Sequence, residues 1–202
     1  MRILSKKNID EASSILANGG IIAFPTETVY GFGVIFDNAE SYKRLIAVKR
    51  RPPEKPFTMM LSDKKDIEKY AYISEKSRLL IEKFVPGQIT LLLKGKEDLP
   101  QYCRSKEGLV GIRIPDDEYV RELIGKVDKP LLVPSANKSG EPPLTNNKDV
   151  VKNFENEIDA VIEGQSISNI PSTIVLVSND VRIIREGIIK KEDIEKVLGE
   201  KI

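Results

Sequence analysis

The segment from Pro25 to Gly33, PTETVYGFG, brings two hydroxyls, a carboxylate and a phenol together beside two glycines. Glycines allow tight turns and a close approach of the backbone to a ligand. Polar side chains at the end of an apolar strand are well placed to orient a small substrate. A polar turn after a strand explains the same residues equally well, so this segment needs support from elsewhere in the chain.

The stretch from Lys43 to Lys55 is the most positive part of the chain. Against one acid, Glu54, it holds six basic residues: Lys43, Arg44, Lys49, Arg50, Arg51 and Lys55. Arginine forks and lysine point charges suit phosphate oxygens. The alternative is a solvated helix end, because cations are favoured at helix C-termini.

A third segment, Val133 to Thr145, runs from an apolar stretch into a loop rich in Ser, Asn, Gly and Pro. Ser135 and Asn137 could hydrogen-bond to a phosphate or a carbonyl, although the same residue types also build ordinary turns. Arg113 interrupts the apolar run 110–114 and therefore needs a partner, either a protein carboxylate or an anionic ligand.

Two further polar groups, Ser172 and Arg185, flank the last predicted strands. Across the chain, a polar or cationic group repeatedly stands where an apolar strand ends or is interrupted. Strand ends converge in open sheets, and ligands bind there. The pattern predicts a shared binding cleft.

The composition limits the chemistry. The chain has no histidine and one cysteine, Cys103. Serine–histidine and cysteine–histidine nucleophiles are therefore excluded, as are zinc sites built from histidine or several thiolates. Catalysis must rest on Lys, Arg, Asp, Glu, Ser, Thr, Tyr and backbone groups, with Mg²⁺ as an expected companion.

Length and charge indicate one folded domain over residues 1–202. Forty per cent of the residues are apolar, and 32 basic residues nearly balance 31 acidic ones. This argues against disorder and against a general polyanion binder. The single cysteine, the lack of a signal-peptide pattern and the lack of a membrane-length apolar run predict a cytoplasmic protein that does not bind membranes.

The elements that must position these residues alternate along the chain. Apolar spacing, Gly and Pro stops and Ser caps predict helices over 5–18, 40–49, 63–71, 74–84, 117–124, 147–154 and 192–198. Short apolar runs predict strands over 21–24, 57–61, 89–93, 110–114, 131–133, 160–162, 174–177 and 181–184. Pro52-Pro53 is expected to end the second helix. The mixture predicts a layered α/β or α+β domain with a mixed sheet.

At this point the ordered motifs resemble the YrdC-like family. They are PTETVYG (25–31), Lys49-x-Arg51-Pro52, PGQIT (86–90), VGIRIP (110–115), PSANKSG (134–140), STI (172–174) and Arg185-x-Gly187, and the match runs from about residue 8 to residue 198. The resemblance implies a three-layer α+β fold, with a YrdC/RibB-like twisted mixed sheet, helices on both sides and a positively charged concave cleft.

The resemblance also implies a reaction. Family members join L-threonine, bicarbonate and ATP, used with Mg²⁺, into threonylcarbamoyl-AMP and pyrophosphate. The product serves threonylcarbamoylation of adenosine 37 in tRNA, so threonylcarbamoyl-transferase proteins are expected downstream partners, and direct tRNA contact stays open. A loop over 104–109 or 164–170 is expected to close over the labile carbamate. No direct protein ligand is expected for the metal.

The resemblance assigns roles residue by residue. The threonine end would be formed by Thr26, Arg113, Val133 and Ser172. The nucleotide would be held by Lys49, Arg51, Lys55, Leu109, Ser135, Asn137, Pro143 and Arg185. The catalytic group would be Lys49, Arg51, Ser135 and Asn137.

Three alternatives stay open. Met60 stands near a position where many relatives carry a histidine that contacts threonine, which leaves room for a paralogue with altered amino-acid specificity. The basic stretch 43–55 would also suit a non-catalytic double-stranded RNA or tRNA binder, although the few aromatics are not clustered for base stacking. A domain that uses carbamoyl phosphate within larger maturation enzymes is the third alternative.

Overall fold

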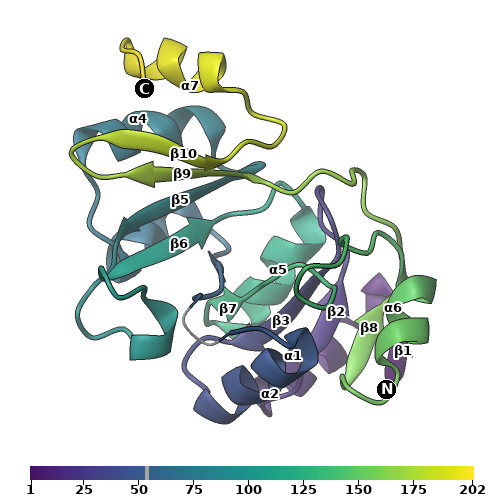
Figure 1. Cartoon of the computed structure of the whole chain (residues 1–202). Coiled ribbons are helices and arrows are strands. Elements are labelled where there is room, and N and C mark those ends of the chain that lie inside the picture. The colour runs from purple at the N-terminus through teal and green to yellow at the C-terminus, as the bar shows by residue number, and fades with distance from the viewer. Residues whose placement is uncertain (53–54) are drawn as a thin grey trace.

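The computed structural model describes residues 1–52 and 55–202, and the strands in these ranges form one mixed sheet (Figure 1). Its order is β1-β8-β2-β3-β7-β4-β6-β5-β9-β10. The bounds are β1 Arg2–Leu4, β2 Ile22–Phe24, β3 Gly31–Ile35, β4 Met59–Met60, β5 Ile89–Lys94, β6 Leu109–Arg113, β7 Leu131–Leu132, β8 Ala160–Ile162, β9 Thr173–Val177 and β10 Val181–Arg185. The pairs β1–β8, β2–β8, β4–β6 and β5–β9 are parallel, and the other neighbours are antiparallel.

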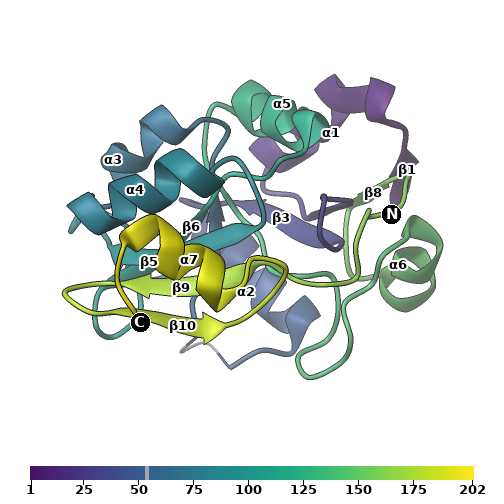
Figure 2. The same cartoon turned by 90° about the horizontal axis from the view of Figure 1, so that it is seen from above.

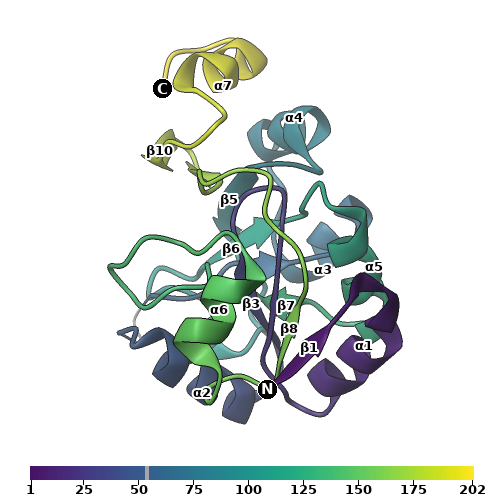
Figure 3. The same ribbon diagram turned by 90° about the vertical axis from the view of Figure 1, so that its right-hand side faces the viewer.

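Helices lie on both faces of this sheet, which confirms the predicted three-layer α+β class. The helices are α1 Ile9–Ala17, α2 Ala39–Lys49, α3 Ile67–Tyr70, α4 Glu75–Phe84, α5 Glu118–Val127, α6 Asn147–Phe154 and α7 Lys191–Leu198. Figure 3 shows α2 and α6 on one side of the strands and α1, α3, α4 and α5 on the other. Helix α1 packs beside α5, as Figure 2 shows, and α7 packs against α4. Short 3₁₀ turns cover Lys6–Asn8, Lys64–Asp66 and Gln101–Cys103.

Side chains alternate between two environments along β5 and β6, as the period of a strand requires. Leu91, Leu93 and Ile112 are buried in the core cluster that also contains Leu80 and Ile81 of α4. The residues between them point to the opposite face and line a cavity: Thr90, Leu92, Leu109, Gly111 and Arg113. One face of these strands therefore builds the core, and the other builds a candidate binding site.

Helix α2 ends where the sequence predicts, but for a different local reason. Asn38 caps its start by accepting a hydrogen bond from the Ser41 N–H at 3.0 Å. After Lys49, Arg50 adopts a left-handed conformation with φ 48°, and this residue turns the chain out of the helix. Pro52 follows that turn, while Pro53 lies outside the described residues.

All of the predicted helices and strands correspond to elements of the structure, although several are shorter than expected. The prediction missed two strands, β1 and β3. The five residues of β3, GFGVI, begin inside the polar segment 25–33, and their two glycines hide the strand pattern. Strand β1 has two exposed residues, so it lacks a strong apolar signal. Within the described ranges, no helix is long and apolar enough to cross a membrane.

Candidate active site

A cavity of about 450 Å³ lies on the face of β5 and β6 opposite α4. Eight of the predicted site residues line it: Arg51, Lys55, Leu109, Arg113, Val133, Ser135, Ser172 and Arg185. These residues come from segments as distant as 51 and 185 in the sequence, so the fold brings the expected strand ends together. Among the described wall residues, four are basic (Arg51, Lys55, Arg113 and Arg185) and one is acidic, Glu107.

Thr26 lies behind the wall of the cavity. Its side chain is buried, with the residue 2% exposed, and its Oγ1 donates to the carbonyl of Val29 at 2.8 Å. The Thr28 hydroxyl lies 2.8 Å from the same oxygen, and it is Thr28 that lines the cavity. Thr26 therefore braces the loop that presents Thr28, and a direct contact of Thr26 with a substrate stays a prediction.

Lys49 is also buried, and its ammonium points into the protein. Its Nζ donates to the carbonyl of Ser135 at 2.6 Å, to the carbonyl of Asn137 at 2.6 Å and to Asn137 Oδ1 at 2.9 Å. A lysine ammonium has three N–H donors, and all three are used. In this conformation Lys49 fastens the loop that carries Ser135, and no donor is left for a phosphate.

Burial, together with the nearby charge of Arg51, lowers the pKa of Lys49 to about 8, while the charge of Glu141 opposes the shift. The protonated form is the one that makes the three hydrogen bonds. The ammonium therefore keeps its full role only below about pH 8.

Ser135 and Asn137 form a small network on the same loop. Asn137 Oδ1 accepts from Ser135 Oγ at 2.6 Å, and Asn137 Nδ2 donates to the carbonyls of Lys138 and Glu141 at 2.9 and 2.6 Å. Ser135 borders the cavity, but Asn137 stands behind it and Pro143 is not part of the wall. The loop is tied to the PTETVYG segment, because the N–H of Ala136 donates to the carbonyl of Tyr30 at 2.7 Å.

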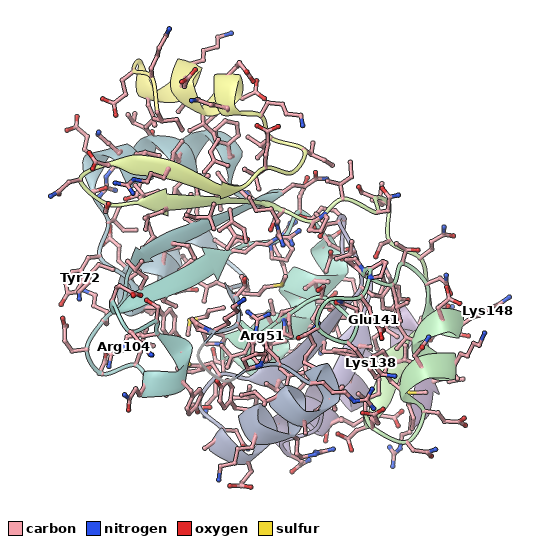
Figure 4. All side chains as sticks on the ribbon, in the orientation of Figure 1. Arg51, Tyr72, Arg104, Lys138, Glu141 and Lys148 are labelled. Carbon is pink, nitrogen blue, oxygen red and sulfur yellow. The ribbon has the colours of Figure 1, made fainter. Side chains whose placement is uncertain are left out.

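Arg51 and Arg185 are anchored by backbone carbonyls. Arg51 Nε donates to the carbonyl of Lys55 at 2.9 Å, and Figure 4 shows Arg51 in the middle of the molecule, between α2 and the β5–β6 pair. Arg185 donates through Nε and Nη2 to the carbonyl of Ser172 at 3.1 and 2.8 Å. Burial lowers the pKa of both groups, but guanidinium stays charged in proteins. Within the described residues the hydrogen-bond partners of both arginines are neutral oxygens, so both charges remain for an anion.

Arg113 finds a protein carboxylate, which answers the question that the sequence left open. Its Nη2 donates to Glu27 Oε1 at 2.8 Å and to Thr28 Oγ1 at 2.9 Å. Both side chains of the ion pair are 6% exposed. The pair joins the first motif to strand β6 at one end of the cavity.

Sequence reasoning missed Glu27, Thr28 and Thr90 as site residues. Thr90 lines the cavity, and its Oγ1 lies 2.8 Å from the Ser172 hydroxyl. All three stand inside motifs that the sequence had already singled out, PTETVYG and PGQIT, so the signal was present in the neighbours of the chosen residues.

The basic stretch 43–55 is divided among different surroundings. Lys43 pairs with Glu40 at 2.9 Å and Arg44 with Asp159 at 2.9 Å, while Arg50 lies 3.8 Å from Glu157. Lys49 is buried, and Arg51 and Lys55 line the cavity. Glu54 lies outside the described residues. The described cations of this stretch therefore do not form one basic face.

The structure also bears on metals, thiols and loops. In the parts of the chain that are described, no group of three or more His, Cys, Asp or Glu residues could hold a metal ion.

Burial raises the pKa of the Cys103 thiol to about 12, so it is a poor nucleophile. The segment 104–109 contributes Ser105, Glu107 and Leu109 to the wall, and in 164–170 Ile167 is 85% exposed. Closure of either segment stays a prediction.

A mixed sheet with helices on both faces and an arginine-lined cavity places this chain among α+β proteins whose site suits small anionic molecules. The chain belongs to the Sua5/YciO/YrdC family, whose model, described as telomere recombination, matches residues 14–187. It is 36% identical to a Methanocaldococcus jannaschii protein over 186 residues, which is 91% of this chain and 87% of that one.

Two longer proteins are also similar. The threonylcarbamoyl-AMP synthase of Bacillus subtilis (strain 168) is 33% identical over 196 residues, or 95% of this chain and 56% of the relative. The crystal structure of Pyrococcus abyssi Sua5 complexed with L-threonine superposes with a TM-score of 0.93 at 31% identity, covering 100% of this chain and 62% of that one. The chain therefore spans a little more than half of these two relatives.

Proposed function

We propose that this chain is a threonylcarbamoyl-AMP synthase, which joins L-threonine, bicarbonate and ATP into threonylcarbamoyl-AMP and pyrophosphate. The name of the Bacillus relative and the threonine in the Pyrococcus structure support this activity. Within this chain, the observation that carries the proposal is the pair of cavity-lining guanidiniums, Arg51 and Arg185, that rest on carbonyls instead of carboxylates. Such groups suit a triphosphate and a carboxylate.

The reaction needs positioning more than a protein nucleophile. The amine of threonine adds to the carbon of CO₂, which is in equilibrium with bicarbonate, and loses a proton to give a carbamate. A carbamate oxygen then attacks the α-phosphorus of ATP, and the bond to pyrophosphate breaks. Both reactants are anions, so the cations of the cavity offset their repulsion and hold them in line.

In this proposal the two ends of the cavity have different tasks. Arg51 and Lys55 hold the phosphates, and Ser135 borders the reacting groups. Arg113 and Ser172 hold the amino acid, whose carboxylate pairs with Arg113. Lys49 and Asn137 act from behind the wall by fixing the position of Ser135.

Mg²⁺ is proposed to arrive with ATP. Among the described residues, the wall offers one carboxylate, Glu107, beside several hydroxyls. This donor set would suit a Mg²⁺ ion held mainly by the phosphates of ATP, with Glu107 as the carboxylate available beside it. Such an ion would supply neutralisation of the phosphate charge. Delivery of the product to threonylcarbamoyl-transferase proteins that act on tRNA, in the cytoplasm, completes the proposal.

The test is an assay of the purified chain with ATP, Mg²⁺, bicarbonate and labelled L-threonine. We expect pyrophosphate release and a labelled threonine–AMP adduct, both dependent on threonine. The variant R51A should lose at least about tenfold in kcat/KM for ATP, the scale of one charge-assisted contact. The matched variant R44A removes an arginine that pairs with Asp159 outside the cavity and should stay within about twofold.

Absence of a threonine-dependent adduct in the unmodified chain would refute the proposed activity. Equal kinetics in R51A and R44A would instead remove Arg51 from the nucleotide site while leaving the activity in place.

A further inference from the structure

Glu27 and Arg113 form a buried ion pair at the border of the cavity. Each side chain is 6% exposed, and the pair distance is 2.8 Å. A buried ion pair adds little to stability compared with a well-packed apolar pair, because desolvation of both charges offsets their attraction. Its place at the cavity calls for an explanation from binding.

The geometry fixes the guanidinium by one edge. Arg113 Nη2 donates to Glu27 Oε1 at 2.8 Å and to Thr28 Oγ1 at 2.9 Å, so both of its N–H groups are used. Glu27 Oε1 also accepts from the backbone N–H of Asp116 at 3.0 Å, which fixes the carboxylate. Two further atoms of the pair, Glu27 Oε2 and Arg113 Nε, are buried and have no hydrogen-bond partner among the described residues.

The remaining nitrogen of Arg113, Nη1, makes no hydrogen bond within the described residues. Arg113 lines the cavity, whereas Glu27 stands behind it. Two acceptors on one nitrogen therefore set the rotation of the guanidinium and leave the other nitrogen for a ligand.

We propose that Glu27, which the family resemblance gives no role, is a positioning residue that orients Arg113 toward the carboxylate of the amino-acid substrate. This inference rests on the proposed function, because it assigns a task within the same site. Glu27 touches no substrate itself and acts through Arg113, with Thr28 as the second acceptor.

The charges at this end of the cavity match a single carboxylate. Arg113 and Arg185 both line the cavity, and the charge of Arg113 adds to burial in lowering the pKa of Arg185, whose expected contact with the nucleotide stays a prediction. Glu27 cancels one of these two positive charges, so the end as a whole carries one positive charge. That sum suits a carboxylate better than a phosphate, and it separates the amino-acid end from the end with Arg51 and Lys55.

The experiment compares L-threonine with L-threoninamide, which has the same shape but no carboxylate charge. Isothermal titration gives both dissociation constants for the unmodified chain, for E27Q and for E11Q, in which the matched Glu→Gln change breaks the exposed Arg2–Glu11 pair. E27Q leaves this end of the cavity with one more net positive charge, so a preference for threonine set by charge alone would rise. If the orientation of Arg113 sets the preference, we expect it to fall at least about tenfold, on the scale of a charged hydrogen bond, with the amide nearly unaffected. E11Q should keep the full preference.

An equal loss of affinity for both ligands, or an unchanged preference, would overturn the proposal. If E27Q shows no cooperative unfolding transition, T28V replaces it, because that change removes the second acceptor of Nη2 without removing a charge. T28V should lower the preference at least about threefold, on the scale of one neutral hydrogen bond, and an unchanged preference there overturns the proposal as well.

The two proposals fail in different ways. If the unmodified chain makes the threonine adduct and E27Q keeps its preference, the role of Glu27 alone is wrong. If the unmodified chain neither binds threonine nor makes the adduct, the proposed function is wrong and the role of Glu27 falls with it.

Discussion

Lys49 is the last residue of α2, and its buried ammonium points at the loop 135–137. The family resemblance assigns Lys49 to the phosphates of the nucleotide. In the fold, its three hydrogen bonds run to Ser135 and Asn137, and its charge lies behind the wall. A lysine in this place connects α2 to the loop 135–137, so its protonation state controls the loop and not a direct contact.

We therefore expect the alkaline side of the pH profile to report Lys49. Burial lowers its pKa from 10.5 to about 8, so kcat/KM should fall as pH rises through about 8. K49R stays charged over this range and should move the fall to higher pH. Initial rates between pH 6 and 10 measure it, and the same midpoint in both proteins would contradict the assignment.

The contribution of Lys49 to stability should change with pH in the opposite direction from kcat/KM. Because the folded chain releases the Lys49 proton near pH 8 and the unfolded chain near 10.5, the unfolded state binds more protons between these values. The contribution of Lys49 to the free energy of unfolding should thus rise across this window and be lowest below it. Denaturant titrations of the unmodified chain and K49R at pH 7 and pH 9.5 compare the two.

At the scale of the element, the end of α2 sets the directions of Lys49 and Arg51. Arg50 between them has φ 48°, a left-handed conformation that costs a non-glycine residue about 1 kcal/mol. This turn lets Lys49 finish the helix toward the core while Arg51 reaches the cavity.

Replacing Arg50 with glycine should therefore stabilise the fold. We expect R50G to add about 0.5–1 kcal/mol to the free energy of unfolding, net of the larger entropy of the unfolded glycine. Its partner Glu157 lies 3.8 Å away on the surface, so little is lost with the ion pair. K43G, inside α2, should instead cost about 1 kcal/mol. Thermal unfolding of both variants decides, and a destabilised R50G would contradict the account of the turn.

The strands show what the sequence could and could not predict. Strands β5 and β6 were visible because apolar residues dominate them. Strand β3 was not, because Gly31 and Gly33 break the pattern. Those glycines are needed by neighbours, since a Cβ at Gly31 would lie 2.6 Å from Val133 and one at Gly33 would lie 2.6 Å from Phe24. The requirement comes from packing between segments that are distant in sequence.

In the candidate site, too, the sequence predicts the local features and misses those set by packing between distant segments. Motifs identified which segments converge, because residue type and order are local facts. They did not identify which side of the wall each residue would occupy. Thr26 and Thr28 differ by two positions, yet only Thr28 reaches the cavity, since the loop between two strands turns within the motif.

At the scale of the whole molecule, the division of the basic stretch argues for a small-ligand cavity over a nucleic-acid surface. Nucleic-acid affinity grows with the number of phosphates that free cations neutralise. Lys43, Arg44 and Arg50 face outward but lie near Glu40, Asp159 and Glu157.

We expect the combined variant K43A/R44A/R50A to change the affinity for tRNA by less than about threefold at 150 mM salt. Fluorescence anisotropy with labelled tRNA measures this. A loss of tenfold or more, without any loss of adduct formation, would establish this outer face as an RNA-binding surface.

The alternation of β5 and β6 has a consequence for how such proteins can diverge. Residues that line the cavity and residues that form the core occupy alternate positions of the same strands. Changes at 90, 92, 109 and 111 can therefore alter what the cavity accepts while 91, 93, 110 and 112 keep the domain folded. A one-residue insertion within either strand would exchange the two sets at once. Related proteins can therefore differ by substitutions at the cavity-lining positions of β5 and β6, but the lengths of these two strands are constrained.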